Sequence, residues 1–263
     1  MLVHNFDNGG RKGLDTTPQS ANGKIMFLDQ FHTQTSEGIS FSAEQGSLFA
    51  KTVAGDFNVI HDPESKRFCV PGDLLFAMVL GKYGLNTNMH FDFQGMVGKD
   101  VALIYPENPD DKFSITNATA KSFMSVTRSG ELNNNATMIE QLIREYVAFS
   151  GQNFPHILMP LMEKHNVIIN PARPLVIYES MTLELNTIEL TNPTLALNGS
   201  ELNVNGKRGD VKLYFVVKEN GTKIGQGYKK LVLSGLREYD KDTAQSLIDL
   251  YEKLKADFYS TQS

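Results

Sequence analysis

The segment AGDFNVIHDPESKRF, residues 54–68, contains two side chains capable of acid–base chemistry. Asp56 and His61 lie five positions apart, with Asn58 between them. Carboxylate and imidazole groups are common general acids and bases in enzymes. The segment is equally typical of a polar loop after a helix, in which Gly55 ends the helix and Asp56 and Asn58 make turn hydrogen bonds. These residues alone leave both interpretations open, an acid–base centre or a connecting loop.

The overall composition is that of an ordinary globular protein. The chain has 263 residues, of which 41% are hydrophobic and 21% are charged, enough to bury a sizeable core. Its net charge of −5 gives no general attraction to nucleic acid, and no dense stripe of lysine and arginine is present. There is no apolar run of about 18 residues to indicate a membrane span. The N-terminus lacks the apolar region of a secretion signal, so we predict a cytoplasmic protein.

The single cysteine and the histidines give no indication of a metal site. Cys69 is the only cysteine, which excludes an intramolecular disulfide and any site built from several thiolates. It lies in the apolar run RFCVPGDLLF and is predicted to be a small buried hydrophobic residue, not a nucleophile. The remaining histidines outside the two repeated segments, His4, His32, His90 and His165, lack metal-ligand spacing. We predict no metal and no redox cofactor.

Two predicted helices flank the Asp56 segment and must position it. The first covers 40–55, with Ser42 as its N-cap and apolar residues at helical spacing. The second covers 72–85 and is apolar nearly all round, which predicts a buried helix. Asp73 suits the first turn of this helix, and Gly84 suits its end.

Strands with a period of two follow, and the whole order then repeats. The first set of strands is predicted at 88–97, 100–106, 112–118 and 121–131. Two further helices are predicted at 134–151 and 154–167. The second set of strands is predicted at 173–185, 194–206, 210–221 and 222–236, with a tight hairpin at ENGT. A final amphipathic helix covers 241–258, with Asp240 or Asp242 as its cap.

The repeat is visible in the residues as well as in the order of elements. AGDFNVIH ends the first polar helix and SGQNFPH ends the second, and both combine Gly, a polar residue, Asn, apolar residues and His. A duplicated unit is therefore predicted. The predicted parts are a disordered lead (1–25, with Met26 as an alternative start), a first unit with the acid–base segment (26–132), a second, degenerate unit (133–239), and a C-terminal helix and tail (240–263).

An apolar helix wrapped by an antiparallel sheet is the hot-dog arrangement, so the fold class predicted here is an α+β tandem, or double, hot-dog. The run FAKTVAGDFNVIHD resembles the signature of MaoC-like, or type 2, (R)-specific enoyl-CoA hydratases, Ser-Gly-Asp-x-Asn-Pro-x-His. A second element of that family, Val-His-Gly, heads the central helix. The matching positions here are Gly55, Asp56, Asn58 and His61 for the first element, and Val70 and Gly72 for the second.

This resemblance implies roles for four residues. Asp56 and His61 would share one water and carry out the acid–base work, Asn58 would brace the loop, and the Gly72 N–H would stabilise the enolate oxygen. The chain departs from the family pattern at Val59 and Pro71, where the family has Pro and His. Its link from the histidine to the helix glycine is also shorter, and in the family that link forms part of the acyl pocket.

The implied activity is hydration or dehydration of an acyl thioester, with coenzyme A or an acyl carrier as part of the substrate and without a separate cofactor. A hot-dog thioesterase and a non-catalytic acyl-CoA binding protein with a drifted site are the alternatives. The sheets of the two units are expected to join side by side, and either a monomer or a homodimer is compatible with the sequence. No nucleic acid or membrane partner is expected.

The whole chain also resembles an uncharacterised proteobacterial protein family. The runs FSGQNFPHILMPLM, NPARPLVIYESM and LVLSGLR carry this resemblance, at residues 149–162, 170–181 and 231–237. The family has no assigned reaction, so the resemblance bears on fold more than on function.

The second copy is predicted to be inactive, since Gln152 stands where the first copy has Asp56 and cannot act as a base. His156, the counterpart of His61, is then structural, and Gln152 and Asn153 are expected to satisfy backbone groups.

Several cations could contact a phosphate of coenzyme A, but an ordinary structural role is favoured for each. Arg173 is expected to form a salt bridge or cap at the start of a strand. The other cations are expected in exposed hairpin turns, and they are Lys207, Arg208, Lys229 and Lys230.

Overall fold

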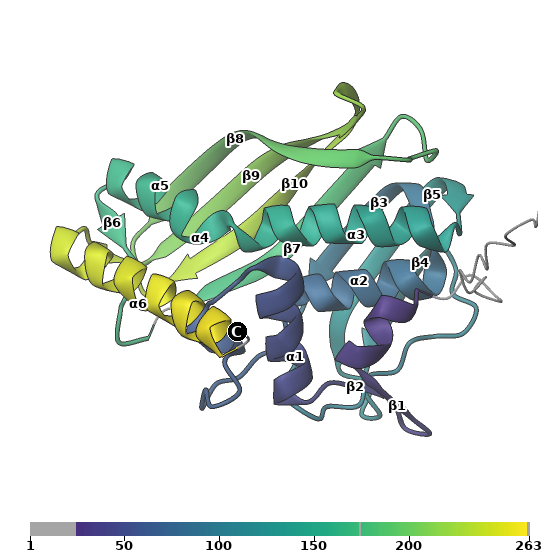
Figure 1. The fold of residues 1–263 in the computed structure, drawn as a ribbon, viewed down its shortest axis with the longest axis horizontal. Coiled ribbons are helices and arrows are strands. Elements are labelled where there is room, and N and C mark those ends of the chain that lie inside the picture. The colour runs from purple at the N-terminus through teal and green to yellow at the C-terminus, as the bar shows by residue number, and fades with distance from the viewer. Residues whose placement is uncertain (1–24, 174, 262–263) are drawn as a thin grey trace, which may run out of the picture.

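One antiparallel sheet of seven strands forms the framework of the protein (Figure 1). The computed structural model describes residues 25–173 and 175–261. The strand order in the sheet is β4-β5-β3-β7-β10-β9-β8. In chain order the strands are β3 (Leu85–Phe93), β4 (Lys112–Thr116), β5 (Ser122–Asn133), β7 (Val176–Leu185), β8 (Pro193–Asn205), β9 (Arg208–Glu219) and β10 (Thr222–Ser234).

Helices cover one face of this sheet, and two short strand pairs lie outside it (Figure 1). The helices are α1 (Ala43–Phe49), α2 (Gly72–Tyr83), α3 (Ala136–Gly151), α4 (Asn153–His156), α5 (Leu158–Lys164) and α6 (Lys241–Ser260). The short helical segments are the 3-10 helices η1 (Met26–Phe31) and η3 (Val59–His61) and the π-helical turn η2 (Ala50–Ala54). The strand pairs are β1 (Thr33–Thr35) with β2 (Gly38–Ser40), and β6 (Val167–Ile168) with β11 (Arg237–Glu238).

The helix ends follow the predicted capping residues. Ser42 caps α1 and forms a capping box with Gln45, which satisfies two backbone donors that a bare helix start leaves unpaired. Gly84, with a φ of 80°, ends α2, whose residues are buried nearly all round. The Asp240 carboxylate accepts a hydrogen bond from the Thr243 N–H and caps α6. These three boundaries confirm the sequence prediction.

The predicted joining of two sheets is confirmed at the pairing of β3 with β7. Antiparallel register matches Asn88 to Glu184 and Asp92 to Ser180, so β4-β5-β3 continues directly into β7-β10-β9-β8. The predicted hairpin turn between β9 and β10 is also present. Asn220 and Gly221 both have positive φ, 49° and 83°, which is the geometry of a type I′ turn. The α+β class is confirmed, with one shared sheet.

Two predicted elements differ in the structure. The segment 100–106 is not a regular strand and makes only isolated bridges through Leu103 and Ile104. The helix predicted over 154–167 is divided into α4 and α5, with Phe154 in an extended conformation (φ −116°, ψ 129°). Pro155 causes this break, because a proline ring disfavours helical geometry in the residue before it and removes a backbone donor.

The main hydrophobic core lies between α2, α3 and the sheet. Phe76 on α2 packs against Phe91 on β3 and Tyr146 on α3, with ring centroids 5.2 and 4.7 Å away. This core therefore combines elements from both of the units predicted from the repeat. A second cluster lies beneath α5 and α6 at the far end of β8, β9 and β10.

The predicted disordered lead, residues 1–25, falls outside the described residues except for Ile25, which is buried in the main core. Across residues 25–173 and 175–261, no helix has the length and apolarity needed to cross a membrane.

The end of α3 makes the tightest contact with the Asp56 region, which yields a test of the packing. A Cβ added at Gly151 would lie 1.9 Å from the backbone oxygen of Ala54. Gly151→Ala is therefore expected to lower stability by about 1–3 kcal/mol, seen as a lower midpoint in thermal or urea unfolding. The control is Gly98→Ala, since an added Cβ there meets nothing within 4 Å. Equal midpoints for the two variants would contradict this packing.

Candidate active site

The Asp56 segment begins where α1 and η2 end. Gly55 takes a left-handed conformation (φ 64°, ψ 25°), and its N–H donates to the Ala50 carbonyl. The Asp56 N–H donates to the same carbonyl over 2.8 Å. Glycine suits this position because a left-handed φ costs it little. The sharp end of the helix therefore fixes the point at which the Asp56 side chain leaves the backbone.

Within the loop, one carboxylate oxygen of Asp56 accepts a backbone hydrogen bond, and the other oxygen faces His61. Asp56 Oδ1 accepts from the Asn58 N–H at 2.9 Å, and Asn58 Oδ1 accepts from the Ile60 N–H at 3.1 Å. These are the turn hydrogen bonds expected of an ordinary polar loop. Asp56 Oδ2 lies 3.8 Å from His61 Nε2. The loop interpretation and the acid–base interpretation are thus compatible in the same segment.

The short link after His61 holds the imidazole ring. His61 Nδ1 lies 2.7 Å from the Cys69 carbonyl oxygen, and the Cys69 N–H donates to Ile60 O at 3.0 Å. Because a carbonyl oxygen only accepts, Nδ1 carries the proton in neutral His61, and Nε2 presents its lone pair toward Asp56. This short link from His61 to the start of α2 therefore orients the histidine.

Burial changes the acidity of the groups in the loop. Desolvation raises the pKa of Asp56 above its ordinary value, although His61, the Asn58 N–H and the positive charge of Lys229 all act in the opposite direction. Burial also raises the pKa of the Cys69 thiol to about 11, so this thiol stays protonated at neutral pH. Cys69 is half-buried, and its protonated thiol agrees with the prediction that it is not a nucleophile.

The C-terminal helix α6 packs on the residue after Asp56. The Tyr251 hydroxyl donates to the Gly55 carbonyl at 3.0 Å. Phe57 is buried against the rings of Tyr251, Phe258 and Tyr259, with centroids 5.8 to 5.9 Å apart. The backbone on both sides of Asp56 is therefore fixed by a helix that is distant in sequence.

A cavity of about 360 Å³ lies beside this loop and is lined by all four predicted site residues. Asp56, Asn58 and His61 line it from one segment, and Gly72 lines it from the first turn of α2. A Cβ on Gly72 would lie 2.8 Å from the Tyr178 ring, so only glycine allows this close approach of backbone and aromatic ring. Pro71, the N-cap of α2, supplies no side-chain cap to the first-turn N–H groups.

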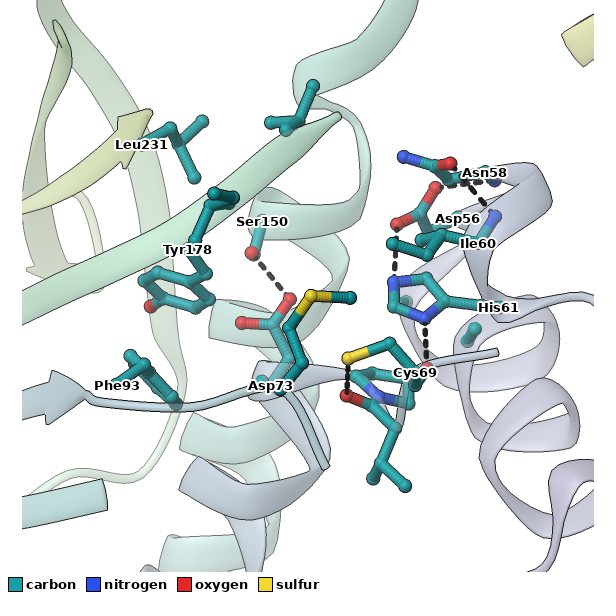
Figure 2. A pocket seen from close by; sticks show the side chains of 18 of the residues that line it. Asp56, Asn58, Ile60, His61, Cys69, Asp73, Phe93, Ser150, Tyr178 and Leu231 are labelled. Atoms are coloured by element: carbon teal, nitrogen blue, oxygen red, sulfur yellow. Dashed lines mark hydrogen bonds and ion pairs between the residues drawn. The ribbon is translucent and has the colours of Figure 1, made fainter. Parts of the chain in front are cut away.

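A buried polar cluster lies across the cavity from Asp56 and His61 (Figure 2). Ser150 Oγ donates to Asp73 Oδ2 at 2.6 Å, and Lys229 Nζ donates to Ser150 Oγ. Lys229 Nζ also lies 3.9 Å from Asp73 Oδ2 and 4.0 Å from the centroid of the Tyr178 ring. Desolvation lowers the pKa of the Lys229 amine, against the opposing effects of Asp73 and Asp56.

The prediction for Lys229 is wrong, because it lies within β10 and not in an exposed turn. Its side chain is 5% exposed. Gly227, Lys229 and Leu231 alternate on the buried face of the strand, and this period of two was a signal available in the sequence. The other cations agree with an ordinary surface role. Arg173, Lys207 and Arg208 are exposed.

The prediction for Asn153 is also wrong. Its side chain is 5% exposed, and within the described residues neither its amide nitrogen nor its amide oxygen has a hydrogen-bond partner. Asn153 lines the cavity instead of satisfying backbone groups. Gln152 and His156, the second-copy counterparts of Asp56 and His61, are exposed and lie outside this cavity's lining.

The fold and the site define an α+β protein in which helices on one face of a single antiparallel sheet shape a small cavity with acid–base groups. Residues 26–242 match the family described as "Protein of unknown function (DUF3581)", and the chain belongs to that family. This agrees with the predicted whole-chain resemblance to a family without an assigned reaction. No curated protein matches the chain.

Several solved structures show distant similarity, and they include two that are described as thioesterases. An acyl-CoA thioesterase II, TesB2, from Mycobacterium marinum has a TM-score of 0.37 and 6% identity, covering 65% of this chain and 90% of its own. A putative thioesterase II from Thermobifida fusca has a TM-score of 0.35 and 8% identity, covering 63% and 87%. Because these TM-scores are low, the functional interpretation rests on the geometry of the site. The MaoC-like resemblance and the tandem hot-dog assignment remain predictions.

The raised pKa of Asp56 predicts a variant that is more stable than the natural chain. Asp56→Asn keeps an oxygen for the Asn58 N–H and removes a partly buried charge, so it is expected to raise the thermal midpoint at neutral pH by about 2–4 °C, the effect of ~1 kcal/mol. The gain should shrink as the pH falls, because protonation of Asp56 then removes the same charge from the natural chain.

Thermal unfolding over a pH series measures this difference. Glu64→Gln is the matched control, since Glu64 is an exposed carboxylate in the same segment. A midpoint for Asp56→Asn that falls below the natural chain at neutral pH would show that the Asp56 charge stabilises the fold.

Proposed function

We propose that this cavity catalyses the addition of water to, or its removal from, an acyl thioester, between the trans-2-enoyl and 3-hydroxyacyl forms. One observation carries the proposal. Asp56 Oδ2 and His61 Nε2 face each other at 3.8 Å, too far for a direct hydrogen bond. Each side chain is held by a backbone partner through its other polar atom. A single water within about 2.8 Å of both atoms completes the arrangement.

The chemistry of hydration suits two adjacent acceptors. Asp56 and His61 accept hydrogen bonds from the water, and its oxygen forms a bond to the β-carbon as the double bond breaks. The electron pair moves toward the thioester carbonyl, and the proton lost by the water rests on the pair before it passes to the α-carbon. Atoms and protons balance, and no further reactant is needed. The Gly72 N–H is the donor proposed for the carbonyl oxygen.

The size and lining of the cavity are suited to binding a small acyl group. Its wall combines Phe93, Tyr178 and Leu75 with the polar groups of the site, and its volume of about 360 Å³ lies at the lower end for ligand sites.

Thioester hydrolysis is the second candidate, because an Asp–His pair that holds a water can direct it at the carbonyl carbon as well as at the β-carbon. The two reactions give different products. Hydration removes the enone absorbance and keeps the thioester, whereas hydrolysis releases a free thiol.

The proposed pair predicts a specific pattern of activity loss. With crotonyl-CoA and longer enoyl-CoAs as substrates, Asp56→Asn and His61→Gln are expected to lower kcat/KM about 10²–10⁴-fold, the usual contribution of a general acid or base. Glu64→Gln should keep the natural rate. Unchanged rates in both site variants would overturn the roles of Asp56 and His61. Release of a free thiol from these substrates would favour the hydrolase.

The pH dependence of the reaction follows from the raised pKa of Asp56. Asp56 must be ionised to accept a proton from water, so kcat/KM should fall as the pH decreases. Because burial raises the pKa of this carboxyl, the fall should occur at a higher pH than an ordinary aspartate would give. A pH–rate profile of kcat/KM measures this limb, and a rate that is independent of pH through the acidic range would contradict the role of Asp56 as a base.

A further inference from the structure

The buried amine of Lys229 lines the cavity and has no part in the proposed reaction. Lys229 is 5% exposed, and it lines the same cavity as Asp56 and His61, on the opposite side. Burying an ammonium is costly unless partners compensate for the lost water. A hydrophobic side chain would pack well at this position in the middle of β10. A lysine there indicates that its amine has a functional role.

The partners of Lys229 hold the amine without using all of its donors. A lysine ammonium has three N–H groups. One is donated to Ser150 Oγ, and the face of the Tyr178 ring lies 4.0 Å from Nζ. Asp73 Oδ2, at 3.9 Å, is beyond direct hydrogen-bond distance and acts through Ser150. At least one donor thus remains for an acceptor that enters the cavity.

The position of this amine relative to the acid–base pair suits a bound substrate. Figure 2 shows Asp73, Ser150 and Tyr178 on one side of the cavity and Asp56 with His61 on the other. An acyl thioester lying between them would have its reacting carbons beside the pair and its carbonyl oxygen directed at the cation. Lys229 and Asp56 both line this one cavity of about 360 Å³, so one small molecule bound in it can contact both.

We propose that Lys229 is a catalytic residue that binds the thioester carbonyl oxygen of the substrate, and that Asp73 and Ser150 position its amine. This inference rests on the proposed function, and it adds a charged donor to the Gly72 N–H. When water adds to the β-carbon, electron density moves onto the carbonyl oxygen, and a cation placed there beforehand stabilises that charge. In a site sheltered from water such an interaction is stronger than in solution.

The Asp73 carboxylate has a defined part in this arrangement. Its Oδ2 accepts from Ser150, which in turn accepts from Lys229, so the three groups form one chain of hydrogen bonds from α2 through α3 to β10. The negative charge of Asp73 favours the protonated amine against the cost of burial. Asp73 therefore opposes the loss of charge that burial favours at Lys229, and Ser150 fixes the direction of its N–H groups.

A chromophoric thioester tests this proposal without turnover. The probe is 4-(dimethylamino)cinnamoyl-CoA, whose absorption band moves to longer wavelength when a positive charge polarises its carbonyl. The natural chain and Lys230→Met are expected to bind the probe with this shift, since Lys230 is the neighbouring lysine and faces away from the cavity. Lys229→Met is expected to bind the probe without the shift, and to lower kcat for crotonyl-CoA about 10²–10³-fold.

A second variant distinguishes loss of the carbonyl contact from a folding defect. Lys229→Met alone leaves Asp73 without its cation, which destabilises a protein more than loss of both charges does. The double variant Lys229→Met/Asp73→Asn removes the buried pair together and should also lose the shift while keeping a cooperative thermal transition. A full shift in either folded variant would overturn the role of Lys229.

The outcomes separate this inference from the proposed reaction. A shift that depends on Lys229, in a chain that neither hydrates enoyl-CoA nor releases thiol, would support carbonyl binding and overturn the proposed reaction. Hydration at the natural rate by Lys229→Met would support the reaction and overturn the role of Lys229. Failure of the natural chain to bind the probe at millimolar concentration would overturn both.

Discussion

The antiparallel pairing of β3 with β7 is the contact on which the rest of the structure depends. It joins three strands from the first half of the chain to four from the second, so both halves share one sheet and one set of covering helices. Without it, α3 would have no reason to lie beside α2, and the end of α3 would not reach the backbone of Ala54. The cavity is thus a product of long-range pairing, although its most conspicuous residues are neighbours in sequence.

Charged side chains line that cavity on two sides, Asp56 on one and the Lys229–Asp73 pair on the other. The two sets are stabilised in different ways. Asp56 relies on local hydrogen bonds within its own loop, whereas Lys229 and Asp73 rely on Ser150, a residue 77 positions from Asp73. Buried charges of this kind seldom improve stability, since desolvation costs as much as the pairing returns. Their presence around one small cavity indicates selection for something other than a well-packed core.

Features governed by local rules could be predicted from the sequence. The caps at Ser42 and Asp240, the end of α2 at Gly84 and the Asn220–Gly221 turn each depend on a few adjacent residues. The proximity of Asp56 and His61 could be predicted as well, because the chain reverses direction over the five residues that separate them.

Features set by distant contacts could not be predicted in this way. The alternation of Gly227, Lys229 and Leu231 indicates which face of β10 the lysine takes. The partners that compensate for its burial, Asp73 and Ser150, lie on distant helices and cannot be read from that pattern. Asn153, with its unpaired amide, lies just before the helix break at Phe154 and Pro155, whereas the apolar pattern of 154–167 indicates one continuous helix. The segment 100–106 alternates as a strand should, but it lies beside only short partners and pairs at single positions.

The packing of α6 on Phe57 has a consequence for how the protein is made. Asp56 is synthesised early, yet the hydroxyl that holds its neighbour Gly55 comes from Tyr251, 196 positions later. A nascent chain that has not yet extended through Phe258 and Tyr259 leaves Phe57 without its aromatic cover. During translation the sheet and α2 can assemble first, and the loop that carries Asp56 takes its final form only when α6 has emerged from the ribosome and docked.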